Sequence, residues 1–159
     1  MLKSIEGFFV ALMVKKNSMI RSVNRQNASE IADIYNHYIL NTTITFAEEL
    51  VSKEGIEREI EQKLNEGLPW LVYETAGHVY GYAYASRWKT RSAYRRSVEV
   101  TVYLAPNKIG NAIAKRLYMD LLPRLKSCGF HSVLGGISLP NLTSEKFHES
   151  FGFSKGGGN

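Results

Sequence analysis

Residue types that build disulfide-rich, metal-binding and membrane proteins are scarce in this 159-residue sequence. Its single cysteine, Cys128, has no second thiol to pair with, which excludes an internal disulfide and favours a reducing, cytoplasmic compartment. The four histidines are scattered along the chain without a zinc-ligand spacing, so we expect no metal site. No apolar run reaches the roughly 20 residues of a membrane-spanning helix, so we expect no membrane association.

Charge is ordinary in amount but uneven in placement. The chain is 44% hydrophobic and 22% charged, as expected of a globular domain, and its net charge of +5 favours anionic partners. Five cations lie between Arg87 and Arg96 (RWKTRSAYRR). No nucleic-acid-binding motif accompanies them, so a small anionic substrate or a nucleotide-bearing cofactor is the preferred partner and nucleic acid is not expected. A solvated basic turn is the alternative.

The first residues differ in character from the rest of the chain. Gly7 to Val14 (GFFVALMV) weakly imitates the core of a signal peptide, but no small-residue cleavage site follows it. A convincing strand opens at Met19. We therefore expect residues 1–18 to be an N-terminal extension, and residues 19–159 to form one domain. A targeting signal in residues 1–18 is the alternative.

The stretch from Ser97 to Lys115 (SVEVTVYLAPNKIGNAIAK) predicts a strand, a loop and the first turn of a helix. Val98, Val100, Val102 and Leu104 alternate with polar or aromatic residues, and Pro106 ends the strand. Small residues from Gly110 to Ala114 open the helix, where free N–H groups and the helix dipole favour an anion such as phosphate. Glu99 lies upstream as a candidate acid or base. An ordinary strand-to-helix connection remains the alternative.

The remaining elements complete a mixed α/β pattern. Strands are predicted over Met19–Val23, Trp70–Glu74, Val79–Arg87 and His131–Ser138. One helix is predicted from a capping box at Asn27 and Glu30, with Ile31, Ile34, Tyr35, Tyr38 and Ile39 on its apolar face. A second starts at Ser52 with Ile56, Ile60 and Leu64 inward, and a last one spans 144–151. The order β-α-α-β-β-β-α-β-α predicts an antiparallel centre and argues against a Rossmann domain.

These elements and several segments in order resemble the GNAT acetyltransferase superfamily. IADIYNHYILNTTITF, GYAYASRWKTRSAY, VEVTVYLAP, ISLPN and FHESFGF are similar to phosphinothricin and methionine sulfoximine N-acetyltransferases, from about Met19 to Phe153. The resemblance implies a mixed central sheet flanked by helices. It also implies direct transfer of the acetyl group of acetyl-CoA to the α-amine of a small amino acid or analogue, without a metal, in a homodimer.

The resemblance also implies roles for particular residues of this sequence. Glu99 and His148 stand where the family handles protons. The acetyl-CoA contacts fall on the backbone of Val102, Tyr103 and Leu104, on the cradle formed by Gly110, Asn111, Ala112, Ile113, Ala114 and Lys115, and on Asn141. The acceptor contacts fall on Phe46, Lys89, Thr90, Arg91, Tyr94, Val100 and Thr101.

The sequence departs from the family pattern in two places. The cradle, usually Arg/Gln-x-x-Gly-x-Gly/Ala, reads Ile109-x-x-Ala112-x-Ala114, so we expect weaker binding of acetyl-CoA. Relatives continue beyond the segment that matches Phe151–Phe153 with a hairpin, so we expect the C-terminal strands of the sheet to be missing. Two alternatives follow: a non-catalytic acyl-CoA-binding or interaction protein, and an acetyltransferase for another amine, such as a protein N-terminus or a polyamine.

Overall fold

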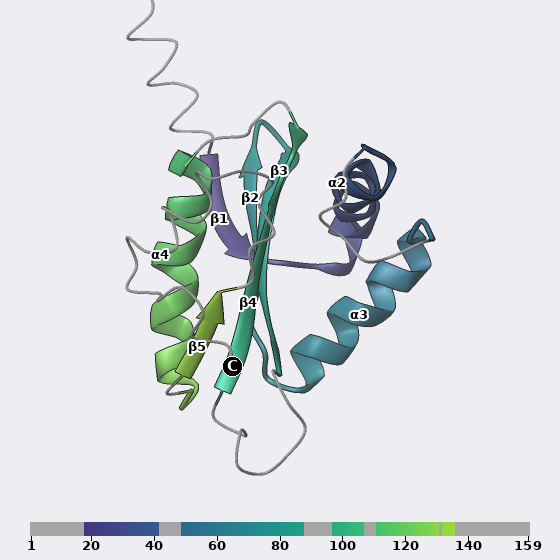
Figure 1. The fold of residues 1–159 in the computed structure, drawn as a ribbon. Helices are drawn as coiled ribbons and strands as arrows, with labels where there is room; N and C mark the ends of the chain where they lie inside the picture. Colours follow the sequence, from purple (N-terminus) through teal and green to yellow (C-terminus); the bar gives the residue numbers. More distant parts are fainter. Residues whose placement is uncertain (1–17, 42–48, 88–96, 107–110, 131, 136–159) are drawn as a thin grey trace, which may run out of the picture.

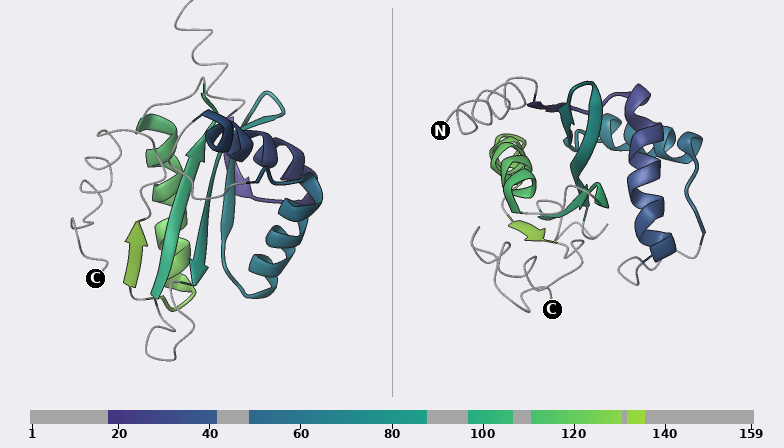
Figure 2. Two further views of the ribbon diagram at one scale, coloured as in Figure 1. Left: turned by 45° about the vertical axis from the view of Figure 1, so that its right-hand side comes forward. Right: turned by 90° about the horizontal axis from the view of Figure 1, so that it is seen from above.

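One sheet lies between helices on both of its faces. The computed structural model describes residues 18–41, 49–87, 97–106, 111–130 and 132–135. Helix α4 (Asn111–Ser127) covers one face of the sheet, and α2 (Ala28–Asn41) and α3 (Lys53–Asn65) cover the other (Figures 1 and 2). No helix in the described part of the chain combines the length and the apolar character needed to cross a bilayer.

The strands lie in the sheet in the order in which they follow one another in the chain. They are β1 (Ser18–Ser22), β2 (Trp70–Thr75), β3 (His78–Arg87), β4 (Ser97–Leu104) and β5 (Ser132–Gly135). Strands β1 to β4 pair antiparallel, and β5 pairs parallel to β4. The predicted antiparallel centre is therefore confirmed, and so is the order of elements up to β5. The helix predicted over 144–151 lies outside the described residues.

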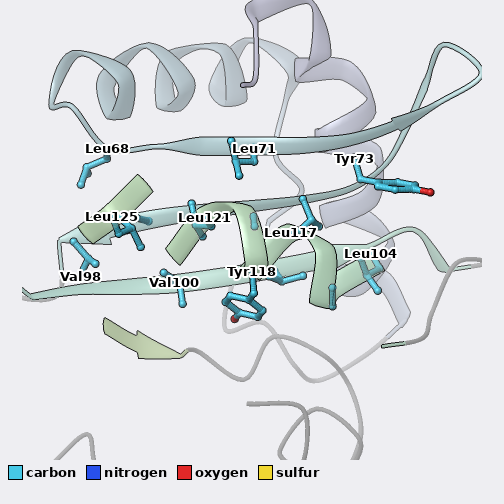
Figure 3. Close-up of a cluster of buried hydrophobic side chains, with 14 residues drawn as sticks. Leu68, Leu71, Tyr73, Val98, Val100, Leu104, Leu117, Tyr118, Leu121 and Leu125 are labelled. Atoms are coloured by element: carbon cyan, nitrogen blue, oxygen red, sulfur yellow. The ribbon is translucent and has the colours of Figure 1, made fainter. Parts of the chain in front are cut away.

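Alternating side chains of the strands form two separate cores. On the α4 face, the even-numbered valines of β4 and Leu104 pack against three leucines of α4, all of them at most 1% exposed: Leu117, Leu121 and Leu125 (Figure 3). On the α2/α3 face, Trp70 of β2 and Tyr82 of β3 pack against Ile31 and Ile56. Helices thus cover both faces of the sheet, and β4 alternates as predicted, with buried valines on the α4 face and partly exposed Ser97, Glu99 and Thr101 on the other.

A β-bulge shifts the pairing of β2 and β3 by one residue between Tyr73 and Glu74. Because side chains alternate with a period of two, a one-residue shift moves the following residues to the opposite face. Val79 consequently lies in the α2/α3 core, whereas Ala83 and Ala85 lie in the α4 core.

The start of the first long helix differs from the sequence prediction. Asn24, not Asn27, is the capping residue: its side chain accepts from the N–H of Gln26 at 3.0 Å, and its own N–H donates to Asn27 Oδ1 at 2.9 Å. A 3₁₀ turn over Arg25–Asn27 then leads into α2. The Glu30 carboxylate instead accepts from the N–H of Val79 at 2.9 Å, which ties α2 to the β2–β3 hairpin.

The second helix begins as predicted but buries less of its apolar face. The Gly55 N–H donates to Ser52 Oγ at 3.0 Å, which confirms Ser52 as the cap. Ile56 and Ile60 are buried, whereas Leu64, predicted to face inward, is 43% exposed. Leu64 lies in the last turn of α3, beyond the part of the helix that the sheet covers.

Candidate functional site

The end of β4 packs against the first turn of α4. Gly81 of the neighbouring strand permits this contact, because a methyl carbon at its Cα would stand 2.8 Å from Leu104 Cδ2 and 3.4 Å from Ile113 Cγ2. Leu104 and Ala114 are both fully buried. The strand end and the helix start are thus held together by side-chain packing.

The first turn of α4 has the character of an anion site. The helix begins at Asn111, and its first turn contains no acidic residue. Ala112 and Lys115 are exposed, while Ala114 points into the core. The first N–H groups of a helix have no intrahelical acceptor and carry its positive dipole end, so a small, cationic first turn can bind phosphate oxygens. The predicted cradle from Asn111 to Lys115 coincides with this turn.

One edge of β4 faces away from β3. Among the described residues, β5 pairs with β4 as far as Gly135 opposite Val100, and β4 continues to Leu104. The Ala105 N–H donates to the Tyr80 carbonyl of β3 at 2.8 Å. Because backbone groups of successive residues point to opposite edges, the N–H groups of Val102 and Leu104 face away from β3, toward the β5 side. This edge is where the sequence predicts backbone contacts.

Glu99 and Thr101 lie on the α2/α3 face of β4. Their side chains alternate with the buried valines, and both are partly exposed. Glu99 is paired in register with Ser86 of β3. Val100 is fully buried in the α4 core, so only its backbone is available to an acceptor on the α2/α3 face. The structure therefore brings a carboxylate and a hydroxyl together beside the strand edge.

Sequence analysis missed a cluster of aromatic rings around Tyr103. Its ring centroid lies 5.4 Å from that of Tyr35, 5.2 Å from that of Tyr38 and 5.6 Å from that of Tyr82. A cavity of about 90 Å³ lies beside the cluster. It is lined by Ile31, Tyr35, Val51, Ile56, Glu59, Trp70, Tyr82 and Tyr84. The period-two spacing of tyrosines in YGYAY (80–84) would have indicated part of this cluster.

Burial determines the chemistry of these phenols. It raises the pKa of the Tyr82 and Tyr84 hydroxyls, although a hydrogen bond with Thr101 partly opposes the rise at Tyr84. Both phenols are therefore neutral at ordinary pH and act as hydrogen-bonding groups rather than as bases.

Several predicted site residues lie outside the described part of the chain. They are Phe46, Lys89, Thr90, Arg91, Tyr94, Gly110, Asn141 and His148. Within the described residues, no group of three His, Cys, Asp or Glu side chains is placed to hold a metal ion.

The sheet, the strand edge and the adjoining helix start are those of an acetyltransferase. The family model for the acetyltransferase (GNAT) domain matches residues 20–158, so this chain belongs to that family and is an N-acetyltransferase. The predicted family, fold and enzyme class are confirmed.

Two relatives and one solved structure show which acetyltransferases this chain resembles. The chain is 37% identical over 138 residues to the phosphinothricin N-acetyltransferase of Streptomyces viridochromogenes, covering 87% of this chain and 75% of the relative. It is 31% identical over 135 residues to the L-methionine sulfoximine/L-methionine sulfone acetyltransferase of Salmonella typhimurium, covering 85% and 79%. A GNAT superfamily phosphinothricin acetyltransferase from Sinorhizobium meliloti, solved in complex with acetyl-CoA, superimposes with a TM-score of 0.79 at 30% identity, covering 87% and 75%.

Proposed function

We propose that this chain acetylates the α-amine of a small amino acid or analogue of the phosphinothricin or methionine sulfoximine type, with acetyl-CoA as the acetyl donor. The observation that carries the proposal is the end of β4, where the N–H groups of Val102 and Leu104 face away from β3 and the strand packs against the first turn of α4. The activities named for the two relatives support the class of acceptor.

The described residues fit acetyl-CoA as a substrate. Its pyrophosphate is dianionic and matches the cationic, acid-free first turn of α4, where Ala112 adds only a methyl group. Its acyl-pantetheine arm carries amide groups that can pair with a strand edge, as an added strand does. Val102 and Leu104 supply backbone groups of that edge. Asn141 and Gly110 are proposed to complete the binding site.

The chemistry needs a base, an oxyanion donor and an acid. Glu99 is proposed to take a proton from the acceptor ammonium, directly or through water, so that the amine nitrogen can attack the thioester carbonyl carbon. A β4 N–H stabilises the oxygen as it becomes negative. The nitrogen of the tetrahedral intermediate loses its second proton to solvent as the carbon–sulfur bond breaks, and His148 is proposed to protonate the leaving thiolate. Phe46, Lys89, Thr90, Arg91, Tyr94 and Thr101 are proposed to hold the acceptor.

The bounds of the catalytic domain, the location of the protein and its oligomeric state are also proposals. Residues 1–18 are proposed to be an extension before the catalytic domain, since the family model begins at residue 20. A cytoplasmic location follows from the single cysteine. The resemblance to dimeric enzymes supports a homodimer, and the chemistry proposed here uses no metal, nucleic acid or membrane.

The test is release of CoA thiol from acetyl-CoA by the purified protein, with phosphinothricin or methionine sulfoximine as acceptor. We expect acceptor-dependent release. In Glu99→Gln, kcat should fall by about 10²–10⁴-fold, with a much smaller change in the acceptor KM, because the residue acts in proton transfer. Glu66→Gln, at an exposed position after α3, is the matched control and should retain full activity.

Each contrary result has a separate meaning. An unchanged kcat in Glu99→Gln removes that carboxylate from the mechanism. A folded protein that binds acetyl-CoA but releases no thiol with either acceptor contradicts the proposed reaction and supports the acyl-CoA-binding alternative. Release with polyamines or an N-terminal peptide alone would reassign the acceptor.

A further inference from the structure

The peptide group between Leu104 and Ala105 is fixed at both ends. Its N–H, on Ala105, donates to the Tyr80 carbonyl of β3 at 2.8 Å. Its carbonyl, on Leu104, accepts from the Tyr38 hydroxyl of α2 at 2.6 Å. The N–H and C=O of a trans peptide point in opposite directions, so this carbonyl faces away from β3. Tyr38 therefore reaches the same edge of β4 at which Val102 and Leu104 present their N–H groups.

Tyr38 is itself held firmly in place. Its side chain is 1% exposed, and its ring packs on that of Tyr103 at 5.2 Å between centroids. Burial raises the pKa of its hydroxyl more than the bond to Leu104 lowers it, so the phenol is a neutral donor. On the preceding turn of α2, Asn36 makes two bonds with the backbone of Val51, at 2.8 and 2.9 Å. The helix that carries Tyr38 is thus anchored independently of β4.

We propose that Tyr38 is a positioning residue for acetyl transfer. Its hydroxyl donates a hydrogen bond to the Leu104 carbonyl, and this bond fixes the edge of β4 where the thioester binds. The inference rests on the proposed function, which places acetyl-CoA at this edge. Tyr38 contacts neither substrate and acts through the backbone of Leu104.

The chemical reason lies in what a thioester oxygen requires. A carbonyl oxygen that becomes negative needs N–H donors and is repelled by neighbouring carbonyl lone pairs. Leu104 presents both an N–H and a C=O to the same edge. The Tyr38 hydroxyl satisfies the carbonyl and holds the strand end at one orientation, so that the donors remain aimed at the edge. Small errors in such an orientation reduce transition-state stabilisation strongly.

The test is Tyr38→Phe, which removes the hydroxyl and retains the ring. We expect kcat to fall about tenfold because the N–H donors are misaligned for the negative oxygen, and the Kd and KM for acetyl-CoA to rise about tenfold, the scale of losing one buried hydrogen bond. The acceptor KM should change less than twofold. Backbone amide exchange at Ala105 should accelerate about tenfold, whereas amides of β2 such as that of Val72 should keep their rates. A purely structural loss would accelerate both and leave acetyl-CoA binding unchanged in the folded fraction.

Tyr73→Phe is the matched control. It removes a phenol of β2, two strands from β4 in the sheet, that donates to Ser18 Oγ at 3.1 Å. This variant should leave acetyl-CoA binding unchanged. Incorporating 4-aminophenylalanine at position 38 restores a donor at the same place, and it should recover most of the acetyl-CoA affinity.

The outcomes separate the inference from the proposed function. A wild-type protein that does not bind acetyl-CoA overturns the proposed function and this inference with it. Wild-type binding with an unchanged Kd in Tyr38→Phe overturns the inference alone, as does equal acceleration of exchange at Ala105 and Val72. Should Tyr38→Phe fail to fold, 4-fluorophenylalanine at position 38 decides: it fills the place of the hydroxyl without a donor, so it should raise the acetyl-CoA Kd about tenfold, and an unaltered Kd overturns the proposal.

Discussion

Individual phenols on the α2/α3 face serve as donors because burial keeps them neutral. The pKa of Tyr82 and Tyr84 is raised mainly by desolvation, so neither can take a proton from an ammonium near neutral pH. The half-buried Glu99 is the carboxylate that β4 places on the same face. Burial therefore leaves the two tyrosines as hydrogen-bonding groups, and the carboxylate of Glu99 is the proposed base.

A carboxylate remote from the site makes stability depend on pH. The Arg21 guanidinium donates to Glu74 at 3.0 Å, and this bond lowers the pKa of Glu74 in the folded protein. A lowered folded-state pKa stabilises the fold above the unfolded value of about 4.3, and the contribution is lost as pH falls through the folded value. Glu74→Gln should cost about 0.5–1 kcal/mol at pH 7 and almost nothing near pH 2, since both partners are partly exposed.

Urea unfolding of both proteins at the two pH values measures this difference. Glu66→Gln, on an exposed carboxylate, should show no pH-dependent change of that size. An equal loss of stability at pH 7 and pH 2 would show that Glu74 stabilises the fold by packing rather than by charge.

At the scale of elements, Gly81 sets the distance between β3 and the first turn of α4. Gly81→Ala would place a methyl group 2.8 Å from Leu104 Cδ2 and 3.4 Å from Ile113 Cγ2. We expect a loss of about 1–3 kcal/mol from overpacking, and weaker acetyl-CoA binding because the turn proposed to bind pyrophosphate is displaced. Thermal unfolding and calorimetric titration with acetyl-CoA measure the two effects.

A compensating variant makes that experiment specific. Leu104→Val removes the Cδ2 atom that the new methyl group would meet, so the double variant should recover part of the lost acetyl-CoA affinity. Acetyl-CoA binding as tight in Gly81→Ala as in the wild type would show that this packing does not set the position of the turn.

Elements defined by local patterns were predictable, and those defined by distant contacts were not. The alternation from Ser97 to Leu104 gave β4 with both of its bounds, because the pattern follows directly from strand geometry. The helix cap was assigned to Asn27 because that residue and Glu30 have the spacing of a capping box. In the structure Glu30 binds Val79, 49 residues away, and Asn24 takes the cap.

In the candidate site, too, local features could be predicted from the sequence and contacts between distant residues could not. Local sequence predicts the cradle from Gly110 to Lys115 and the carboxylate of Glu99 as candidate site residues. The bond between Tyr38 and Leu104 joins residues 66 positions apart, and no spacing rule connects them. The β2–β3 bulge likewise reverses the alternation at Val79, so a strict period of two assigns that residue to the wrong core.

At the scale of the whole molecule, two cores share one sheet and should unfold together. Leu121 is fully buried in the α4 core, and Ile31 is fully buried in the α2/α3 core. Truncating either residue to alanine should cost about 2–5 kcal/mol. In a Trp88→Phe background, tryptophan fluorescence reports on Trp70 in the α2/α3 core, while circular dichroism reports on the whole chain. In Leu121→Ala, both signals should shift to the same denaturant midpoint.

Separate midpoints would contradict that expectation. A fluorescence midpoint that stays at its wild-type value in Leu121→Ala would mean that the α2/α3 core is stable without the α4 core. A shared midpoint in the Ile31→Ala variant is the matching control from the other face.

The order of strands in the sheet has a consequence for the entropy of chain closure. Neighbours in the sheet are also neighbours in sequence, and β2 and β3 are joined by Ala76 and Gly77 alone, both with positive φ, as a type I′ turn requires. Closing such a short loop orders few residues, whereas pairing β5 with β4 also requires α4 and its two connections to be ordered. The pairs β1–β2 and β4–β5, which enclose helices, are therefore more expensive to close than the β2–β3 hairpin.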